Sequence, residues 1–389
     1  MVPIYYNVRS LLVRKANTIA TAFGIALVVF VLASSQMLAN GLSKTMGRSG
    51  RDDQAIVLRK GSDAELSSGI DLSLVNQVLA APGVQRDGSG QPVGVGEVVL
   101  ILAMNRQGQQ EQLSNVTVRG TTAEALALRS EVRIVEGRKP SPGTDEVLIG
   151  RPLVGEYPGM TLGGRFVLNK NREAHVVGVF EANGSVFESE IWADVDTVRS
   201  AFGRQQMVNS VTVALASPAQ FTEFQAAVEG DKRLGLLAQR QSDFFEKQSE
   251  GSVLFLSILG GIIVVFFSIG AMIGAMNTMY AAVQSRRKEI GTLRALGFSR
   301  FAVMRSFVLE SFVLALVGGG LGTLASLGMG AVEFSMMNVS SWSEITFHFE
   351  PEPAILVRSL LVGGLMGLLG GFFPALRAAS VSPLAAMRD

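Results

Sequence analysis

The sequence predicts a membrane protein with four transmembrane α-helices and a large extracytoplasmic α+β domain that contains a strand-rich insertion. One observation is that residues 16–43, 251–285, 311–332 and 359–376 form apolar runs of 28, 35, 22 and 18 residues without Asp, Glu, Lys or Arg. A bilayer core requires about 20 apolar residues of helix. The other observation is that the block between the first two runs has short apolar patterns separated by Gly and Pro, as in a folded domain.

Composition excludes several classes of protein. Only 17% of the 389 residues are charged, against about 25% in typical soluble domains, so a purely soluble enzyme is excluded. A net charge of +1 provides no basic surface for nucleic acid. The chain has no cysteine, which excludes disulfides, thiol catalysis and cysteine-ligated metals. Its two histidines, His175 and His348, lack metal-ligand spacing, so we expect neither a metal site nor a cofactor bound by this chain.

Basic residues gather on one side of the predicted spans. They precede the first span, fill the turn between the second and third, and follow the fourth. The turn holds the acid Glu289 among the bases Arg286, Arg287, Lys288, Arg294, Arg300 and Arg305. The positive-inside rule therefore places both termini and this turn in the cytoplasm. The first span also resembles a signal peptide, but its length and the lack of a cleavage site favour an uncleaved anchor.

These observations divide the chain into segments. We expect a cytoplasmic N-terminus with the first span (1–40), an extracytoplasmic domain (41–252), the second span (253–282), a cytoplasmic turn (283–306), the third span (307–332), a short outer loop (333–353), the fourth span (354–379) and a cytoplasmic tail (380–389). Glu310 and Arg358 fall just inside span ends, where a long side chain such as that of Arg358 reaches the headgroups. No charge lies at mid-membrane, so an ion relay is not indicated.

Short strand and helix patterns alternate in the outer domain. The predicted order is strand 55–59, helix 72–80, strands 98–104 and 112–120, helix 122–129, several strands up to Trp192, helix 196–202, strand 210–215 and helix 218–228. We place the strand-rich subdomain at about 115–205. Residues 38–46 and 239–251 join the domain to the first two spans without Pro. They are either continuous helical stalks, which can carry motion, or ordinary juxtamembrane linkers.

No catalytic residue is predicted. Neighbouring acids are Asp145 with Glu146, Glu188 with Glu190, and Asp194 with Asp196, but scattered surface acids are far more common than acid–base pairs. Ser185 and His175 lack the context of a nucleophile elbow. The glycines of 88–96 do not follow a strand and open a helix, as those of a nucleotide-binding loop do.

Small residues recur at intervals of four in three spans, which places them on one helix face. They are Gly270 and Gly274 in the second span, Gly318, Gly322, Ser326 and Gly330 in the third, and Gly363, Gly367 and Gly371 in the fourth. Such faces allow helix backbones to approach closely in lipid. We therefore predict tight packing of the transmembrane helices and no aqueous pore lined by these faces.

The cytoplasmic turn contains the most informative stretch, RRKEIGTLRALGFSR at 286–300. Ile290, Leu293 and Leu296 lie three residues apart and give a short helix an apolar edge. Gly297 suits the end of that helix, and Ser299 can cap the next one. An amphipathic helix at this position can lie on membrane lipid or dock into a cytoplasmic partner.

This stretch closely resembles the cytoplasmic turn of FtsX/MacB-type permeases, the membrane subunits of type VII ABC transporters. Gly370–Arg388 (GGFFPALRAASVSPLAAMR) is similar to the end of the same family, and Phe307–Gly322 (FVLESFVLALVGGGLG) to its third span. The order of one span, a large outer domain and three more spans also matches. The outer domain resembles the family mainly by position and by fragments such as VVGVF and EIWAD.

The resemblance implies that the turn forms a coupling helix seated in a groove of an ATPase subunit. By position, the contacting residues would be Arg287, Glu289, Ile290, Leu293, Arg294 and Leu296. It also implies a second permease copy or a close homologue, and two copies of an ATPase that bind ATP and Mg. Hydrolysis would move the outer domain mechanically, with no substrate passing through a membrane channel. The expected location is the bacterial inner membrane, with the large domain in the periplasm.

The sequence has no G-x-x-x-x-G-K-[ST] phosphate loop. We therefore expect the ATPase to be a separate polypeptide and this chain to be a non-catalytic subunit. Its leading function is export or extraction of a drug, peptide or lipoprotein, with a periplasmic adaptor, lipoprotein carrier or outer-membrane component as further partner. The alternative is an FtsX-like transmembrane signal transmitter that activates a cell-wall hydrolase. A third, less favoured, is a membrane-anchored sensor without any ATPase.

Overall fold

The computed structural model describes residues 15–108, 113–170, 172–338 and 341–381. The chain divides into two compact units. The helical unit comprises the described residues up to Asn40, Phe255–Val332 and those from His348 onward, and the outer unit comprises Gly41–Leu254 and Glu333–Phe347. Four apolar helices and a mixed α/β domain confirm the predicted fold class.

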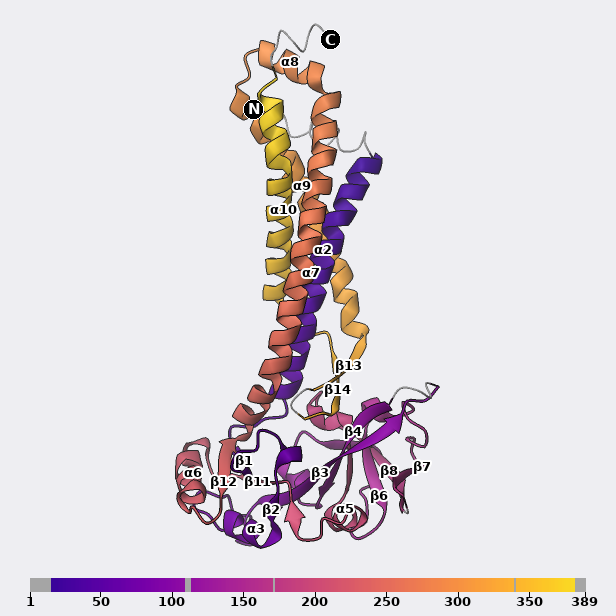
Figure 1. Ribbon diagram of the computed structural model, residues 1–389, viewed down its shortest axis with the longest axis vertical. Coiled ribbons are helices and arrows are strands. Elements are labelled where there is room, and N and C mark those ends of the chain that lie inside the picture. The colour runs from indigo at the N-terminus through magenta and orange to yellow at the C-terminus, as the bar shows by residue number, and fades with distance from the viewer. Residues whose placement is uncertain (1–14, 109–112, 171, 339–340, 382–389) are drawn as a thin grey trace. The chain divides into compact units, whose positions relative to one another are not determined.

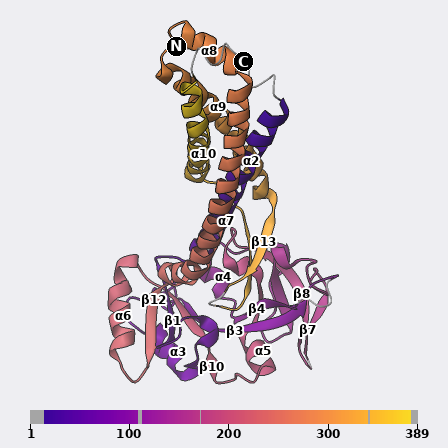
Figure 2. The ribbon, with the colours of Figure 1, turned by 45° about the horizontal axis from the view of Figure 1, so that its top comes forward.

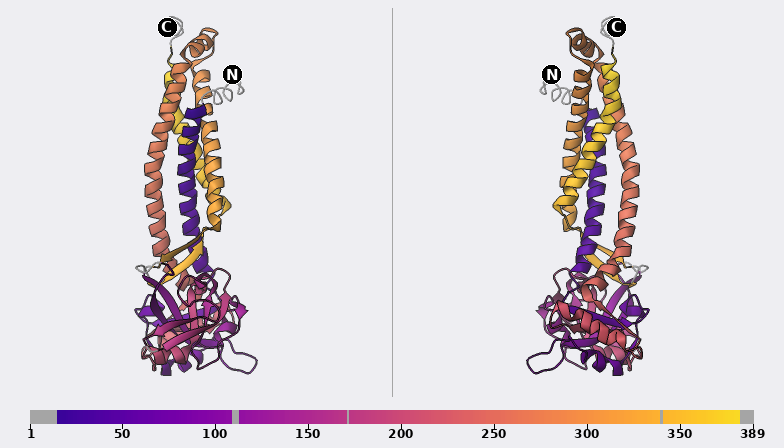
Figure 3. Two further views of the ribbon diagram at one scale, coloured as in Figure 1. Left: turned by 90° about the vertical axis from the view of Figure 1, so that its right-hand side faces the viewer. Right: turned by 90° about the vertical axis from the view of Figure 1, so that its left-hand side faces the viewer.

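Within the described residues, four helices are long and apolar enough to cross a membrane. They are α2 (Lys15–Gly47), α7 (Gln241–Ser285), α9 (Arg300–Leu327) and α10 (Pro353–Ala379). In the helical unit these helices run alongside one another (Figures 1 and 3). The short helix α8 (Arg287–Ala295) joins α7 to α9 across one end of the bundle.

Helix α7 is much longer than a bilayer crossing requires. Its 45 residues correspond to about 68 Å at 1.5 Å per residue, against a hydrocarbon core of about 30 Å. The helix begins at Gln241 in the outer unit and continues unbroken into the helical unit. Helix α2 likewise crosses from one unit to the other, at Gly41. The structure therefore has continuous helices where the sequence left open a stalk or a linker.

Glycines on α9 and α10 bring helix backbones into close contact. A Cβ built at Gly318 would lie 2.5 Å from the carbonyl oxygen of Ala22 on α2, and one at Gly322 would lie 2.2 Å from that of Ala26. Because the opposing atoms belong to backbone, no side chain can be accommodated there. Gly367 of α10 lies equally close to α9, where the methyl carbon of Ala315 would be only 2.2 Å from an added Cβ. Gly363 and Gly371 also have neighbours on α2 or α9 within 3 Å of an added Cβ.

The predicted stripe on α7 differs from those on α9 and α10. Nothing lies within 4 Å of a Cβ built at Gly270 or Gly274, so neither glycine serves close packing within the described chain. Helix α7 is the least covered span, since 11% of its most apolar stretch is buried against 44% for each of the others. It approaches α2 through Gly260 instead, where an added Cβ would lie 1.8 Å from the Oγ of Ser35.

The outer unit is built on a ten-stranded mixed sheet. Its order is β12-β1-β11-β3-β4-β9-β6-β8-β5, and β7 also pairs with β8. The strands are β1 (Gln54–Arg59), β3 (Gly94–Asn105), β4 (Leu113–Thr121), β5 (Arg133–Gly137), β6 (Glu146–Gly150), β7 (Arg165–Asn169), β8 (Arg172–Glu181), β9 (Glu190–Asp194), β11 (Ser210–Ala214) and β12 (Leu236–Arg240). The short strands β2 (Ile70–Asp71) and β10 (Met207–Val208) form a separate pair.

Strand β3 joins the two halves of this sheet. Its first part, Gly94–Glu97, pairs with β11, and its remainder, Val98–Asn105, pairs with β4. Strands β4 to β9 lie in the region expected to be strand-rich, but they share one continuous sheet with β1, β11 and β12. The sheet therefore connects the segments that lead to both α2 and α7.

Short helices complete the outer unit. They are α3 (Leu72–Leu79), α4 (Ala125–Leu128), α5 (Val195–Ala201) and α6 (Phe221–Gly230), with 3₁₀ turns at Glu65–Ser67, Arg151–Leu153, Val186–Ser189 and Pro218–Gln220. Asp71 and Asp194 cap α3 and α5 by accepting hydrogen bonds from backbone N–H groups. Helix α6 lies beside β12 at one end of the sheet, and β7 lies at the other (Figure 2). Buried aliphatic side chains from both halves form one core.

The structure corrects two sequence expectations. Residues 236–240 form strand β12 at the sheet edge, so the helix expected from 239 begins at Gln241. Pairing of β12 with β1 supplies backbone hydrogen bonds that outweigh the polar, helical character of QRQS. The expected outer loop at 333–353 contains a β-hairpin, β13 (Glu333–Met337) with β14 (Glu344–His348), after a 3₁₀ turn at Gly328–Ala331. The second of these strands, EITFH, alternates polar and apolar residues, which is a strand signal that the sequence reasoning did not use.

The backbone contact at Gly322 leads to a testable prediction. Replacing Gly322 with Leu forces α9 away from α2 and should destabilise the helical unit by about 3 kcal/mol or more. The matched control is Gly320→Leu on the same helix, where nothing lies within 4 Å of an added Cβ. Thermal unfolding of the two variants in the same detergent measures the difference. Equal melting temperatures would show that this contact does not hold the bundle together.

Candidate functional site

The α8 turn has well-defined ends. At its C-terminus the N–H groups of Leu296 and Gly297 donate to the carbonyl oxygens of Thr292 and Arg294, at 2.9 and 3.2 Å. Gly297 adopts a φ of +92°, a left-handed conformation that favours glycine and ends the helix. The side chain of Ser299 then accepts from the N–H of Ala302 and caps α9. Both roles expected for Gly297 and Ser299 are confirmed.

One face of α8 is buried against its own chain. Ile290 is only 2% exposed and belongs to an apolar cluster with residues of α7, α9 and α10: Met279, Val283, Val303, Phe307, Ala375 and Ala378. The sequence placed Ile290 among the residues that contact a partner. The structure instead gives it an internal role, because three helices already surround it.

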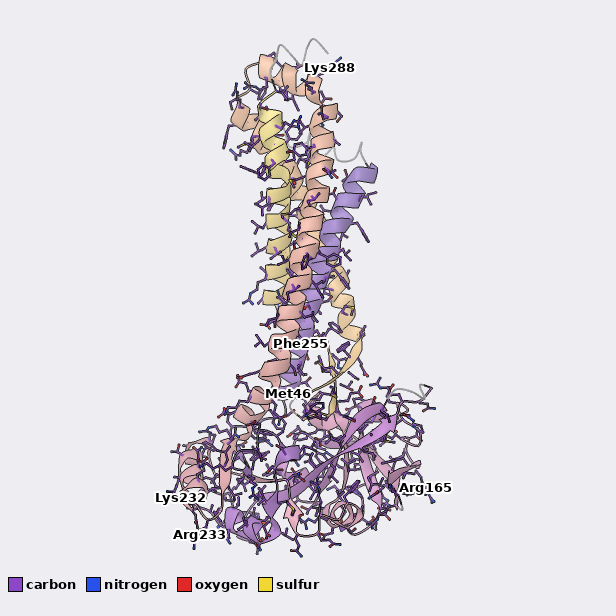
Figure 4. The ribbon with its side chains drawn as sticks, in the orientation of Figure 1. Met46, Arg165, Lys232, Arg233, Phe255 and Lys288 are labelled. Atoms are coloured by element: carbon purple, nitrogen blue, oxygen red, sulfur yellow. The ribbon has the colours of Figure 1, made fainter. Side chains whose placement is uncertain are left out.

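The opposite face of α8 is accessible. Arg287 and Glu289 are exposed, whereas Leu293 and Arg294 are half-buried. Leu296 is 72% exposed, although leucine side chains are usually buried. Lys288 lies on the same turn (Figure 4). Five of the six residues predicted to contact a partner therefore retain accessible surface.

Phe301 extends this accessible surface and was missed by the sequence reasoning. It lies in the first turn of α9, five residues after Leu296, and is 63% exposed. The two apolar side chains flank the Gly297 bend. Phe301 lies between Arg300 and Arg305 in the stretch predicted as a cytoplasmic turn, and the sequence reasoning did not connect it with the apolar edge of the preceding helix.

A buried ion pair fixes the start of α8. The guanidinium of Arg286, the residue that precedes α8, donates to the carboxylate of Glu310 on α9 at 3.0 Å. Both side chains are at least 90% buried, and the guanidinium lies 5.9 Å from the centre of the Phe307 ring. An unpaired charge at this depth is expensive, so the pair restricts where α8 can sit on α9. The sequence identified Glu310 as a charge near a span end but not its partner.

The acids considered as catalytic pairs all have other partners. Glu146 forms an ion pair with Arg138, which lowers the pKa of its carboxyl to about 2. Glu190 binds Arg119 at 2.7 Å, and Asp194 caps α5. Among the described residues, no group of three or more His, Cys, Asp or Glu is placed to hold a metal ion. The accessible α8 surface is therefore the candidate functional site, and it is a binding surface.

This architecture is that of an integral membrane protein with a large α/β outer domain, and known proteins share it. Residues 17–231 match the family model described as MacB-like periplasmic core domain, and residues 261–383 match that described as FtsX-like permease C-terminal. The first match alone covers more than half of the chain. The chain therefore belongs to the MacB/FtsX-like family of ABC transporter permeases. It is a membrane protein with a periplasmic-type domain, and permeases of this family work with a partner ATPase.

Individual relatives agree with this assignment. The macrolide export ATP-binding/permease protein MacB of Escherichia coli K12 is 30% identical over 239 residues, which cover 58% of this chain and 35% of that protein. MacB 2 of Yersinia pestis is 28% identical over 242 residues, which cover 59% of this chain and 34% of that protein. The chain thus spans about a third of the length of the curated relatives it matches.

Two solved structures are similar to parts of this chain. The extracellular domain of the ABC-type transporter YknZ from Gram-positive bacteria has a TM-score of 0.36 and 17% identity, covering 48% of this chain and 99% of that one. The periplasmic region of MacB from Actinobacillus actinomycetemcomitans has a TM-score of 0.38 and 14% identity, covering 52% of this chain and 95% of that one.

The two faces of the α8 turn should respond differently to truncation. Ile290→Ala removes buried methyl groups and should cost about 2–4 kcal/mol of stability. Leu296→Ala is the matched control, and because its side chain is exposed the cost should stay within about 0.5 kcal/mol. Thermal unfolding of both variants in detergent measures the costs. A larger loss for Leu296→Ala than for Ile290→Ala would contradict this assignment of the faces.

Proposed function

We propose that this chain is the permease subunit of a MacB-like ABC transporter. ATP hydrolysis by an ATPase partner moves the periplasmic domain of the permease mechanically. That movement drives the export or extraction of a periplasmic or membrane-embedded substrate, such as a drug, a peptide or a lipoprotein. The observation that carries the proposal is the α8 turn, a rigid helix with an accessible apolar and charged face that belongs to an FtsX-like permease segment.

The chemistry of the α8 surface suits a protein partner. Leu296 and Phe301 offer two exposed apolar side chains, and apolar anchors of this kind dominate binding energy at interfaces. Arg287 and Glu289 offer charges of both signs nearby, which set orientation and specificity. Ile290 and the Arg286–Glu310 pair attach α8 to α9 and α10. A force applied to the accessible face of α8 therefore reaches those helices directly.

The helices suit mechanical transmission better than conduction. Backbone contacts at Gly318, Gly322 and Gly367 close the spaces between α2, α9 and α10. Charge is confined to the ends of these helices, so the bundle offers no polar path for a substrate. Helices α2 and α7 run unbroken from the helical unit into the outer unit. A displacement at the membrane thus has a stiff covalent route to the periplasmic domain.

The remaining assignments follow from this proposal. The chain is a non-catalytic subunit of the inner membrane, with the α8 turn and both termini in the cytoplasm and the outer unit in the periplasm. ATP and Mg bind to the ATPase, of which two copies join two permease chains. A periplasmic adaptor, a lipoprotein carrier or an outer-membrane component receives the substrate. The basic residues of the turn and tail support this orientation.

Purification of the tagged chain from native membranes tests the proposal. The wild-type chain should retain a Walker-motif ATPase in mild detergent, identified by mass spectrometry. Leu296→Asp places a charge in the apolar contact, and loss of about 2 kcal/mol or more at such a site should reduce the retained ATPase at least tenfold. The control, Leu113→Asp, changes a residue of the outer unit that is 69% exposed and should retain the ATPase.

Three outcomes would contradict the proposal. Absence of any ATPase from the wild-type preparation would remove the transporter assignment. Equal retention by Leu296→Asp and the wild-type chain would show that the α8 face is not the contact. Recovery of a cell-wall hydrolase in place of an adaptor or carrier would replace transport with signal transmission.

A further inference from the structure

Three segments of the chain connect the outer unit to membrane-spanning helices. They are the end of α2, the beginning of α7, and the β13–β14 hairpin that links α9 to α10. Each of them has residues inside the outer unit. Their contacts there converge on one short stretch, Val186–Glu190, which we call the junction segment.

The end of α2 reaches the junction segment through Ser49. The backbone N–H of Val186 donates a hydrogen bond to the Oγ of Ser49 at 2.9 Å. That hydroxyl in turn donates to the carbonyl oxygen of Thr45 in the last turn of α2, at 2.8 Å. Ser49 is 1% exposed. The two hydrogen bonds therefore form a buried link between α2 and the junction segment.

The beginning of α7 reaches the same segment through an aromatic contact. The rings of Phe187 and Phe245 meet edge to face, with centroids 5.8 Å apart. Phe244 packs against Phe245 in the same manner at 5.3 Å. All three rings are at most 4% exposed. Edge-to-face pairs of buried rings have a preferred geometry, so the beginning of α7 and Phe187 are packed in a defined orientation.

The hairpin makes the third connection. The backbone N–H of Thr346 donates to the Oγ of Ser189 at 2.9 Å. Glu344 of the same strand forms an ion pair with Arg106 of the outer unit and accepts from the hydroxyl of Tyr157 at 3.3 Å. The hairpin therefore contacts other segments of the outer unit through Thr346 and through Glu344, and the Thr346 contact is with the junction segment.

Buried charges hold the junction segment to the sheet. Glu190 accepts two hydrogen bonds from Arg119 of β4, at 2.7 and 2.8 Å, and Arg119 also pairs with Glu65 and Glu97. Burial would lower the pKa of Arg119, but these carboxylates raise it well above its ordinary value. Burial would likewise raise the pKa of Glu97, but the charges of Arg129 and Arg119 lower it to about 2. Arg119 and Glu97 are therefore charged at neutral pH, and the segment cannot shift without disturbing the ion pairs of Arg119.

A cavity of about 40 Å³ lies where the three connections meet. Its walls include Met46 of α2, Phe245 and Gln248 of α7, and Ser343 of the hairpin, together with Ser189 of the junction segment. Figure 4 shows Met46 at the end of α2. The connections thus share one small space as well as one segment of chain.

We infer that the junction segment mechanically couples the three connections, so that movement of any one of them is transmitted to the other two and to the central sheet. Ser49, Phe187 and Ser189 are positioning residues in this scheme. This inference rests on the proposed function, because the proposed mechanical movement of the outer domain is what gives the coupling a role. The coupling itself exists without ATP or an ATPase.

Hydrogen exchange of the full chain in detergent, without ATPase or nucleotide, tests the coupling. Ser189→Ala removes the acceptor for Thr346 and should speed exchange in the hairpin by about three- to tenfold. Coupling predicts a similar increase in the end of α2 (41–49) and the beginning of α7 (241–248). Strand β7, distant from the junction in sequence and sheet order, should be unchanged. Ser189→Thr, which keeps the hydroxyl, should restore wild-type exchange.

The reciprocal variant and a control complete the test. Ser49→Ala should speed exchange in the hairpin although it removes only the α2 link. Ser200→Ala is the matched control, because its hydroxyl bonds to Thr197 and Arg172 in the outer unit away from the junction segment. Exchange that increases only at the connection where the bond was removed would overturn the inference. General unfolding would appear in β7 as well and would equally count against it. Since no ATPase is present, failure here is separate from failure of the proposed function.

Discussion

The lipid bilayer supplies no water for hydrogen bonds or ion solvation, and this constraint determines the rest of the structure. Backbone groups must be satisfied within each helix, so four apolar helices result. Without a hydrophobic driving force between them, α9 packs through glycines at Gly318 and Gly322 directly on the backbone of α2. The deeply placed Glu310 is paired with Arg286.

The α8 turn and the outer unit are each held in place by buried contacts. At the α8 turn, an internal apolar cluster and a buried ion pair support a helix whose other face remains accessible. In the outer unit, the ends of α2 and α7 and the β13–β14 hairpin meet the sheet at Val186–Glu190. Helices α2 and α7 run unbroken from the helical unit into the outer unit. The chain belongs to a permease family whose members work with an ATPase.

The sequence predicted the features that depend on local composition. Uncharged runs identify the spans, Gly297 and Ser299 mark the α8 turn, and most strands of the outer unit coincide with short apolar or alternating runs. Features that depend on distant partners were not predictable. Ile290 has the pattern of an exposed edge but is buried by residues of three other helices, and Gly270 belongs to a small-residue stripe that α7 does not use within the described chain. Arg119 and Glu190 are ordinary charged strand residues until the fold brings them 2.7 Å apart.

Spin-label distances between the two units test the central claim of mechanical transmission most directly. The chain has no cysteine, so Lys232→Cys in the outer unit and Pro351→Cys before α10 provide unique labelling sites in the chain reconstituted with its ATPase. The account predicts that the distance distribution changes between the nucleotide-free and vanadate-trapped states, and that adding Leu296→Asp abolishes the change. An unchanged distribution during continuing ATP hydrolysis would contradict it.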